Sequence, residues 1–424
     1  MATRFVWIGF FLLTIANLLI YINRNNGFEY VQQSAYGELY PNISKGIASI
    51  SIEKDSAAII DLKGYSAAAK WNIVCNDSVI IHDQLLPVHF SLNENVNRYT
   101  LQSTDSTVKP IIIDLDYAPA ELYKRSGSSV ATNYEIRYSS EPFVTGDSVS
   151  VSKWEDPLDY VDAAELNTVK QLVTDSLHIK PTDSTLNKIK IIGSYIYQSV
   201  KQNIGVPPDS LAQYSVYNQF NLAKNRQTKI WCANITDIFH LFATTAGIVT
   251  RKIGVTGNRG IFNTGLHSAN ECYLPETGEW AYTDITQNIL SLTDSTGKIL
   301  NTVDLYQLKK LNQTKNIILY SSGDSAVETV NYSDPEKKYV WGENEILFPY
   351  PYPPGTLYNW SNKLQRYINR KPWLEIYSEK TVYDNSKFYL KFYLFYTWVV
   401  LGLLVLISYL FNFKLRQQLN KQTF

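Results

Sequence analysis

The longest apolar runs of the chain stand near its two ends. The run 5–22 holds 18 residues, and as a helix rising about 1.5 Å per residue it reaches about 27 Å, close to the ~30 Å hydrocarbon core of a bilayer. The run 392–413 carries no charged residue, is aromatic at its outer edge and is aliphatic over 399–407. Each run therefore predicts a transmembrane helix.

A cleaved signal peptide is the competing interpretation of the first run, because Arg4 precedes it. The following residues, 23–26, are Asn-Arg-Asn-Asn and offer no small-x-small cleavage site, which favours an uncleaved anchor. Basic residues precede the first run and follow the second. This distribution predicts that both termini are cytoplasmic and that residues 25–390 lie on the extracytoplasmic side.

After the first run, short β-branched stretches are separated by Asn, Asp, Ser and Gly. Strands are expected at 48–53, 58–62, 71–74, 78–81, 99–102, 111–114 and 134–138. Strands of this length and spacing are typical of an antiparallel β-sandwich, which we expect as a domain over 28–150. His82 and His89 lack a third ligand at metal-binding spacing, so solvent-facing strand residues are the favoured interpretation and no metal site is expected.

The pattern then changes to a helical period. Helices are expected at 163–176 and 184–202, and a third begins at Cys232, with apolar residues at Ile235, Ile238, Phe239, Phe242 and Ala246. Strands follow at 248–255, 267–274 and 280–286, the last two joined by the turn 275–278. This order predicts an α+β domain over 155–320.

The last part before the second apolar run, 321–390, is predicted to be a juxtamembrane segment rich in proline and aromatic residues. Its stretch 348–355 cannot form a helix because prolines fix φ and lack an N–H donor. Two interpretations remain open. The stretch is either a stiff spacer that packs its aromatic rings against the domain or the membrane interface, or a ligand for a proline-recognising partner.

Composition narrows the functional classes. The chain has 424 residues, 45% of them hydrophobic, and equal numbers of acidic and basic residues, 39 each, without a long run of one sign. A nucleic-acid partner is therefore not expected. Three cysteines without a Cys-x-x-Cys pair indicate neither a disulfide framework nor a zinc knuckle, and no cofactor is expected.

Cys232 is the main candidate for chemistry. At a helix N-terminus, the peptide dipoles and unpaired N–H groups favour the nucleophilic thiolate. Alternation places His267 on one face of its strand, and places Tyr282 and Asp284 together on one face of the next, so imidazole and carboxylate can meet across the hairpin. A Cys/His/Asp triad is the predicted site. The competing interpretation is an inert core cysteine, which is favoured for Cys75 and Cys272.

The run 186–286 resembles the transglutaminase-like superfamily, which has papain-like cysteine chemistry. The matching features are Cys232 at a helix start, the segment Gly-Ile-Val-Thr-Arg at 247–251, His267, and the segment Trp-Ala-Tyr-Thr-Asp-Ile-Thr at 280–286. The resemblance implies that Cys232 is the nucleophile, His267 the general base and acid, and Asp284 the residue that orients the imidazole.

The chain departs from the usual family pattern at three positions. Ile230, Ala269 and Ile285 stand where the family usually has glycine, an aromatic residue and proline. The family also takes an oxyanion-stabilising residue from the stretch before the nucleophile. The candidates there are Tyr214, Tyr217, Gln219 and Trp231, beside the backbone N–H of Cys232 itself.

These observations predict a membrane-anchored member of the superfamily. We expect a thiol acyl-transfer enzyme that acts on amide bonds of peptides or proteins in the cell envelope, by hydrolysis as a peptidase or deamidase rather than by cross-linking. The alternative, from another class, is a catalytically silent scaffold that binds partners within a cell-envelope assembly.

Overall fold

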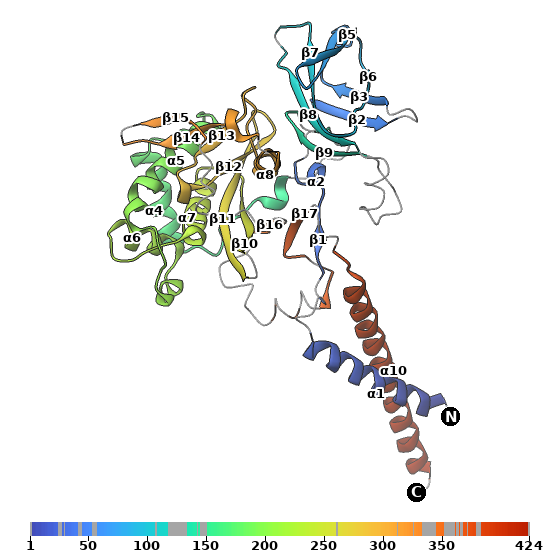
Figure 1. The fold of residues 1–424 in the computed structure, drawn as a ribbon. Coiled ribbons are helices and arrows are strands. Elements are labelled where there is room, and N and C mark those ends of the chain that lie inside the picture. Colours follow the sequence, from blue (N-terminus) through green and yellow to red (C-terminus); the bar gives the residue numbers. More distant parts are fainter. Residues whose placement is uncertain are drawn as a thin grey trace. The chain divides into compact units, whose positions relative to one another are not determined.

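The computed structural model describes most of the chain as two compact units. One unit is 34–351, and the other joins 1–33 to 352–424. The described residues are 2–23, 28, 30–40, 45–52, 57–106, 108–117, 134–141, 143–144, 151–259, 262–311, 313–324, 326–332, 345–351, 361, 364, 368–370, 372–378 and 383–422. Within them the chain is a mixed α/β protein with several sheets (Figure 1).

Residues 46–139 form what we call the two-sheet region. Its strands are β2 (Gly46–Ile52), β3 (Ala57–Lys63), β4 (Trp71–Cys75), β5 (Ser78–Gln84), β6 (Val88–Ser91), β7 (Asn95–Ser103), β8 (Ile111–Tyr117) and β9 (Tyr134–Ser139). They pair as β2-β3-β6 and β5-β4-β7-β8-β9, all antiparallel. One apolar core, centred on the fully buried Trp71 and Tyr99, lies between the two sheets. The predicted strands are confirmed, and β6 was not predicted.

A group of helices follows the two-sheet region. They are η1 (Val151–Trp154), α4 (Ala163–Gln171), η2 (Leu172–Ser176), α5 (Thr185–Val200), η3 (Lys201–Asn203), η4 (Asp209–Gln213), α6 (Val216–Lys224) and α7 (Cys232–Thr245). The predicted apolar face of α7 is buried at Ile235, Ile238, Phe239 and Phe242. α7 ends because Gly247 takes a positive φ of 78°, where residues with a side chain are strained.

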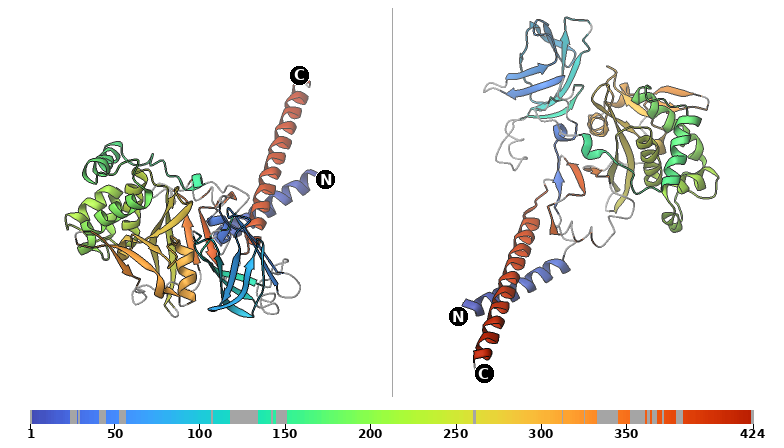
Figure 2. Two further views of the ribbon diagram at one scale, coloured as in Figure 1. Left: turned by 90° about the horizontal axis from the view of Figure 1, so that it is seen from above. Right: turned by 180° about the vertical axis from the view of Figure 1, so that it is seen from behind.

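Three long strands lie against these helices. β10 (Thr250–Arg259), β11 (Phe262–Leu274) and β12 (Glu279–Thr283) form consecutive antiparallel hairpins, and β16 (Glu345–Pro349) pairs with the other edge of β10. The helices α4 to α7 gather on one side of these strands, as Figure 2 shows from two directions. α7 packs against both β10 and β11, so the first residue of α7 and the middle of β11 come close together.

Two sequence predictions need correction. The strand expected over 280–286 ends at Thr283, because the Asp284 side chain accepts from the N–H of Gln287 and begins the short helix η5 (Ile285–Gln287). The stretch 348–355 begins inside strand β16, which ends at Pro349, and so is not a spacer along its whole length. The expected packing of its aromatic rings against the domain is found, because Phe348 is fully buried and Tyr350 stacks on Trp154. Residues 352–355 lie outside the described residues.

The remaining elements of this unit are α2 (Tyr36–Leu39), β13 (Ser291–Thr293), α8 (Thr302–Lys310), η6 (Thr314–Asn316), β14 (Ile318–Ser322) and β15 (Val327–Asn331). β13, β14 and β15 form a separate antiparallel sheet. Strand β15 lies beyond residue 320, where the juxtamembrane segment was expected to begin.

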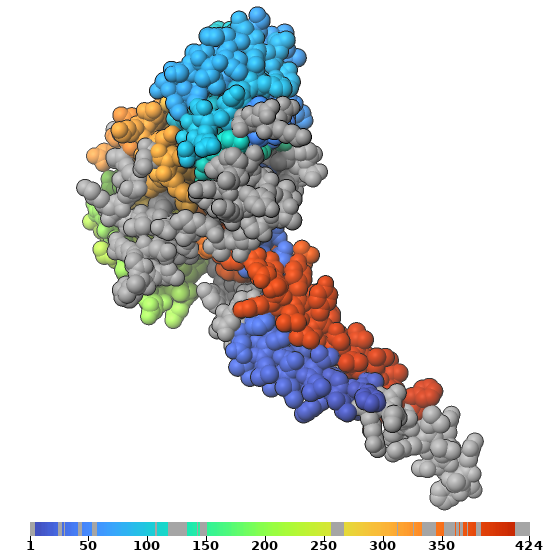
Figure 3. Space-filling model, turned by 45° about the vertical axis from the view of Figure 1, so that its right-hand side comes forward, coloured from blue at the N-terminus to red at the C-terminus, as the bar shows by residue number. Residues whose placement is uncertain are grey.

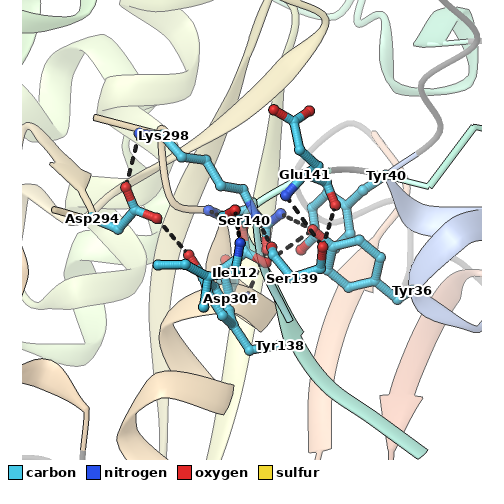
Figure 4. A network of polar contacts seen from close by, with 12 residues as sticks. Tyr36, Tyr40, Ile112, Tyr138, Ser139, Ser140, Glu141, Asp294, Lys298 and Asp304 are labelled. Carbon is cyan, nitrogen blue, oxygen red and sulfur yellow. Dashed lines mark hydrogen bonds and ion pairs between the residues drawn. The ribbon is translucent and has the colours of Figure 1, made fainter. Parts of the chain in front are cut away.

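A buried polar network joins the two-sheet region to the residues that follow β12 (Figure 4). Lys298 donates from Nζ to the carbonyl of Ser139 at 2.5 Å and pairs with Asp304 at 2.9 Å. Tyr138 donates its hydroxyl to Asp294 at 2.7 Å. Because each of these charges is buried with a partner, removing one member would leave an uncompensated charge and cost about 3–5 kcal/mol.

The other unit contains two apolar helices, α1 (Ala2–Ile22) and α10 (Ser386–Gln422), which lie side by side (Figure 3). Each is long and apolar enough to cross a membrane. The indole N–H of Trp398 donates to the Thr14 hydroxyl at 2.8 Å, and Phe10 stacks on the same indole. A side chain at Gly402 would lie 3.0 Å from the Phe10 ring, so glycine permits this close packing.

Next to these helices, β1 (Gln32–Gln33) pairs in parallel with β17 (Leu374–Ser378). The Asn385 amide accepts from the N–H of Val31 and donates to its carbonyl. These bonds tie the segment that follows α1 to the residue that precedes α10.

Candidate active site

The nucleophile candidate lies where the sequence predicted it, at the first residue of α7. The preceding segment is held in place by backbone bonds: Ile230 donates to Asn203 and accepts from Gly205. On the helix side, the N–H of Trp231 donates to the Asn234 side chain at 3.3 Å. The Cys232 side chain is thus carried by a segment that is fixed on both sides.

His267 and Asp284 form a hydrogen bond of 2.6 Å between Nε2 and Oδ2, and both side chains are buried. The register of the hairpin explains the contact. Asn270 pairs with Thr283, so Asp284 projects diagonally toward His267 on the same face. The predicted contact between imidazole and carboxylate is found, although Asp284 is the N-cap residue of η5 and does not lie within a strand.

The Cys232 thiol lies beside the His267 side chain, and each group shifts the pKa of the other. Burial acts to raise the pKa of Cys232, but the interaction with His267 outweighs it and lowers that pKa below its usual value. Burial likewise acts to lower the pKa of His267, yet the charge and hydrogen bond of Asp284 raise it to about 10. These directions favour a thiolate beside an imidazolium.

Asp284 is surrounded by donors. Its Oδ2 accepts from the Tyr282 hydroxyl at 3.1 Å in addition to His267, and its Oδ1 accepts from the N–H of Gln287 at 3.3 Å. Tyr282 is fully buried. The sequence analysis placed Tyr282 on the same face as Asp284 but gave it no role, although a tyrosine two residues before a buried carboxylate on one strand face is a usable signal.

A buried ion pair joins the neighbouring strands β10 and β11. Arg251 of the Gly-Ile-x-x-Arg segment contacts Oε2 of Glu271 at 2.7 Å, and both side chains are fully buried. Tyr40 and the N–H of Thr302 donate to the other oxygen of Glu271. The Arg251 guanidinium lies 4.1 Å from the centre of the Trp280 ring. This arrangement holds β10 against β11, so Arg251 has a structural role in the sheet.

The four oxyanion candidates have different surroundings. Gln219 is buried on α6, where its amide accepts from Asn234 at 2.8 Å and donates to the Tyr214 carbonyl at 2.8 Å. It therefore braces the first turn of α7. Trp231 is 48% exposed next to the thiol, Tyr214 is 49% exposed, and Tyr217 is half-buried. Among the described residues, no hydrogen bond or ion pair joins any of these four side chains to Cys232, and their roles remain predictions.

The three departures from the family pattern are all buried. Ile285 fills the space in front of a glycine on α5: a Cβ at Gly193 would lie 2.7 Å from the Ile285 side chain. Ile230 takes part in the backbone bonds before the nucleophile, and Ala269 lies on β11. These residues pack the interior around the site.

A second histidine–aspartate pair was missed by the sequence analysis. His240, on α7 two helical turns after Cys232, contacts Asp156 at 2.9 Å between Nε2 and Oδ2, and both are buried. Tyr160 also donates to Oδ2 of Asp156. Burial, the largest influence, lowers the pKa of His240 despite the Asp156 hydrogen bond.

The other two cysteines are free and buried. Burial raises the pKa of Cys272, which makes it a poor nucleophile at neutral pH. Cys75 lies in the core of the two-sheet region, far from any described His–Asp pair in sequence. Among the described residues, no three His, Cys, Asp or Glu side chains come together as a metal-binding group.

Neither a protein-family model nor a curated protein matches the chain. Two solved structures, both provisionally named as proteases, show a faint likeness. A cysteine protease from Cytophaga hutchinsonii aligns with 80% of this chain and 94% of its own, at 9% identity and a TM-score of 0.24. A protease from Parabacteroides distasonis aligns with 32% of this chain and about a quarter (26%) of its own, at 16% identity and a TM-score of 0.19. At these TM-scores the likeness defines neither a shared fold nor a shared activity.

Proposed function

We propose that the chain is a membrane-anchored cysteine amidase or peptidase with a transglutaminase-like catalytic region. The observation that carries this proposal is the position of the His267 imidazole, which lies beside the Cys232 thiol and hydrogen-bonds Asp284 at 2.6 Å. An activated nucleophile, a base in reach and a group that orients the base are the parts that thiol acyl transfer requires.

The reaction begins with attack of the Cys232 thiolate on the carbonyl carbon of an amide. The oxyanion that forms lies near the start of α7, where the backbone N–H of Cys232 is the proposed donor. His267 gives its proton to the leaving amine, and a thioester remains on the sulfur. His267 then removes a proton from water, which attacks the thioester, releases the carboxylic acid and restores the thiol–imidazole pair. Asp284 holds the imidazole in the required orientation throughout.

Covalent labelling tests this proposal without a known substrate. The full chain in detergent is treated with limiting iodoacetamide at about pH 6, where an ordinary thiol with a pKa near 8.5 is less than about 1% ionised. We expect Cys232 to be alkylated about 100-fold faster than Cys75 and Cys272, because the pKa of Cys232 is lowered and the other two thiols are buried. Equal and slow labelling of all three cysteines would refute an activated thiol and would favour the silent scaffold instead.

Trapping the acyl-enzyme then identifies the substrate class. Wild-type protein and the His267→Ala variant are incubated with envelope peptides, quenched with acid and analysed by mass spectrometry for a peptide thioester on Cys232. Adding a primary amine shows whether water or an amine accepts the acyl group. Free acid as the only product supports hydrolysis, whereas incorporation of the amine supports cross-linking.

For the cellular location, we propose that α1 and α10 span the membrane, with both termini cytoplasmic and the catalytic region outside. The apolar composition of both helices supports membrane insertion. We expect a protease added to intact spheroplasts to digest residues 25–390 and to spare a C-terminal tag. Digestion of the tag with protection of the catalytic region would reverse the orientation and exclude envelope peptides as substrates.

A further inference from the structure

Oδ2 of Asp284 accepts two hydrogen bonds, and the second donor has no place in the mechanism described so far. His267 donates to this oxygen at 2.6 Å and the Tyr282 hydroxyl donates at 3.1 Å. Tyr282 is itself held firmly, since it is fully buried, its N–H donates to the Leu300 carbonyl, and it pairs with Glu271 across the hairpin.

The direction of the tyrosine bond is fixed by its surroundings. Burial, and then the negative charge of Asp284, raise the pKa of Tyr282 well above its usual value, so the phenol keeps its proton and donates it. Among the described residues, the other titratable side chains that act on this group include Cys232 of α7, Glu271 of β11 and Tyr332, which follows β15. None of these brings a positive charge to the carboxylate.

We propose that Tyr282 is a positioning residue for the proposed reaction: by donating to Oδ2 of Asp284, its hydroxyl orients the carboxylate and limits how tightly it holds the proton of the His267 imidazolium. This inference rests on the proposed function. A carboxylate oxygen that already accepts one hydrogen bond has less negative charge to offer a second donor.

The chemical consequence concerns proton release. His267 must give its proton to the leaving amine, and a more tightly held proton is a poorer acid near neutral pH. Without the Tyr282 hydroxyl, Oδ2 would attract the imidazolium more strongly. The tyrosine therefore keeps His267 able to act as both acid and base.

The test measures the charge beside the Cys232 sulfur. Iodoacetate is anionic and iodoacetamide is neutral, so the ratio of their alkylation rates at Cys232 is high while His267 is an imidazolium and falls when it loses its proton. The pH at the midpoint of that fall reports the His267 ionisation in the full chain. We expect Tyr282→Phe to move the midpoint upward by about 0.5 to 1 pH unit.

A second variant acts in the opposite direction. Replacing Tyr282 by 3-fluorotyrosine keeps the ring and the hydroxyl but makes the phenol a stronger donor, so the midpoint should move downward. This variant also serves if Tyr282→Phe does not fold. Thermal unfolding of each variant is recorded beside the titration, because a purely structural tyrosine would alter stability and leave the midpoint in place.

Tyr40→Phe is the matched control. It removes the same hydroxyl from another buried carboxylate, Glu271, which also accepts hydrogen bonds from Arg251 and Thr302. It should lower stability without moving the midpoint. An unmoved or lowered midpoint in Tyr282→Phe, or an equal shift in Tyr40→Phe, would overturn the inference and leave the proposed function standing. A wild-type Cys232 with no preference for iodoacetate at any pH would instead overturn both.

Discussion

The unit 34–351 contains two buried histidine–aspartate pairs that look alike, but the pKa values of their histidines are shifted in opposite directions. His267 with Asp284 and His240 with Asp156 have Nε2 to Oδ2 distances of 2.6 and 2.9 Å. The pKa of His267 is raised to about 10, whereas that of His240 is lowered. A close carboxylate is therefore not sufficient to make a histidine an acid–base catalyst.

The neighbours explain the difference. Asp284 and then the Cys232 thiol beside His267 both raise its pKa, so two neighbours favour its charged form. His240 is more deeply buried, and the positive charge of Lys252 nearby opposes protonation. A tyrosine hydroxyl donates to the histidine-facing oxygen in both pairs, Tyr160 to Asp156 and Tyr282 to Asp284, so this bond does not cause the difference. We interpret His267 as catalytic and His240 as a structural residue that ties α7 to the segment before α4.

The largest expected effect separates the two histidines directly. His267→Ala should lower the turnover of a peptide substrate identified by acyl-enzyme trapping by at least about 1000-fold, because it removes the general base and acid of the proposed triad. His240→Ala, in protein that remains folded, should keep turnover within about tenfold of wild type, because it does not touch the reacting atoms. Steady-state kinetics at pH 7 measures both. Comparable losses in the two variants would erase the distinction.

Replacing the two aspartates should also affect turnover unequally, with a smaller difference than between the two histidine variants. Asp284→Asn keeps the volume but not the charge that stabilises the imidazolium, so we expect a loss of turnover smaller than that of His267→Ala and at least about tenfold. Asp156→Asn should mainly reduce thermal stability. The measurement is kcat/KM together with the melting temperature of each variant. A larger kinetic loss in Asp156→Asn than in Asp284→Asn would contradict the assignment.

The smallest effect concerns acid stability. Because the folded-state pKa of His240 lies below its unfolded value near 6.5, its neutral form stabilises the fold above that pH, and this contribution is lost as pH falls. His240→Gln should therefore weaken the decline of stability between about pH 7 and 5, by about 1–2 kcal/mol at the acid end. Chemical denaturation at both pH values tests this. An unchanged decline would mean that His240 is not held neutral.

The protonation of Cys232 and His267, by contrast, adds no pH dependence to the free energy of unfolding near neutral pH. A folded thiolate and imidazolium together carry one proton, as do a neutral thiol and imidazole in the unfolded chain between about pH 6.5 and 8.5. The two groups then bind the same number of protons in the folded and unfolded states, so they contribute no pH dependence to the free energy of unfolding in that window. The state of the triad has to be measured at the sulfur.

Local patterns predicted the parts of the site that depend on neighbours in sequence. The period of apolar residues after Cys232 predicted α7, and strand alternation brought His267 toward Asp284. The cap that ends β12 at Asp284 was missed because a side chain that bonds Gln287 competes with strand continuation, a choice that periodicity does not reveal.

Contacts between distant segments could not be predicted from periodicity. Asp156 lies 84 residues before His240, and Tyr40 lies 231 residues before Glu271, so neither partner is visible in a local window. The pairing of β16 with β10 is another such contact. The two apolar helices α1 and α10, whose signal is composition alone, were predicted from the sequence.

The central claim is that His267 makes Cys232 a thiolate at neutral pH, and the ultraviolet absorbance of the thiolate measures this directly. The difference in absorbance between the wild-type chain and Cys232→Ser is followed from about pH 5 to 9, and again in a His267→Ala background. The account predicts one equivalent of thiolate already at pH 7 in the wild type and its loss in the His267→Ala background, where an ordinary thiol pKa near 8.5 returns. A wild-type signal that rises only with that ordinary pKa, or one that is unchanged by His267→Ala, would contradict it.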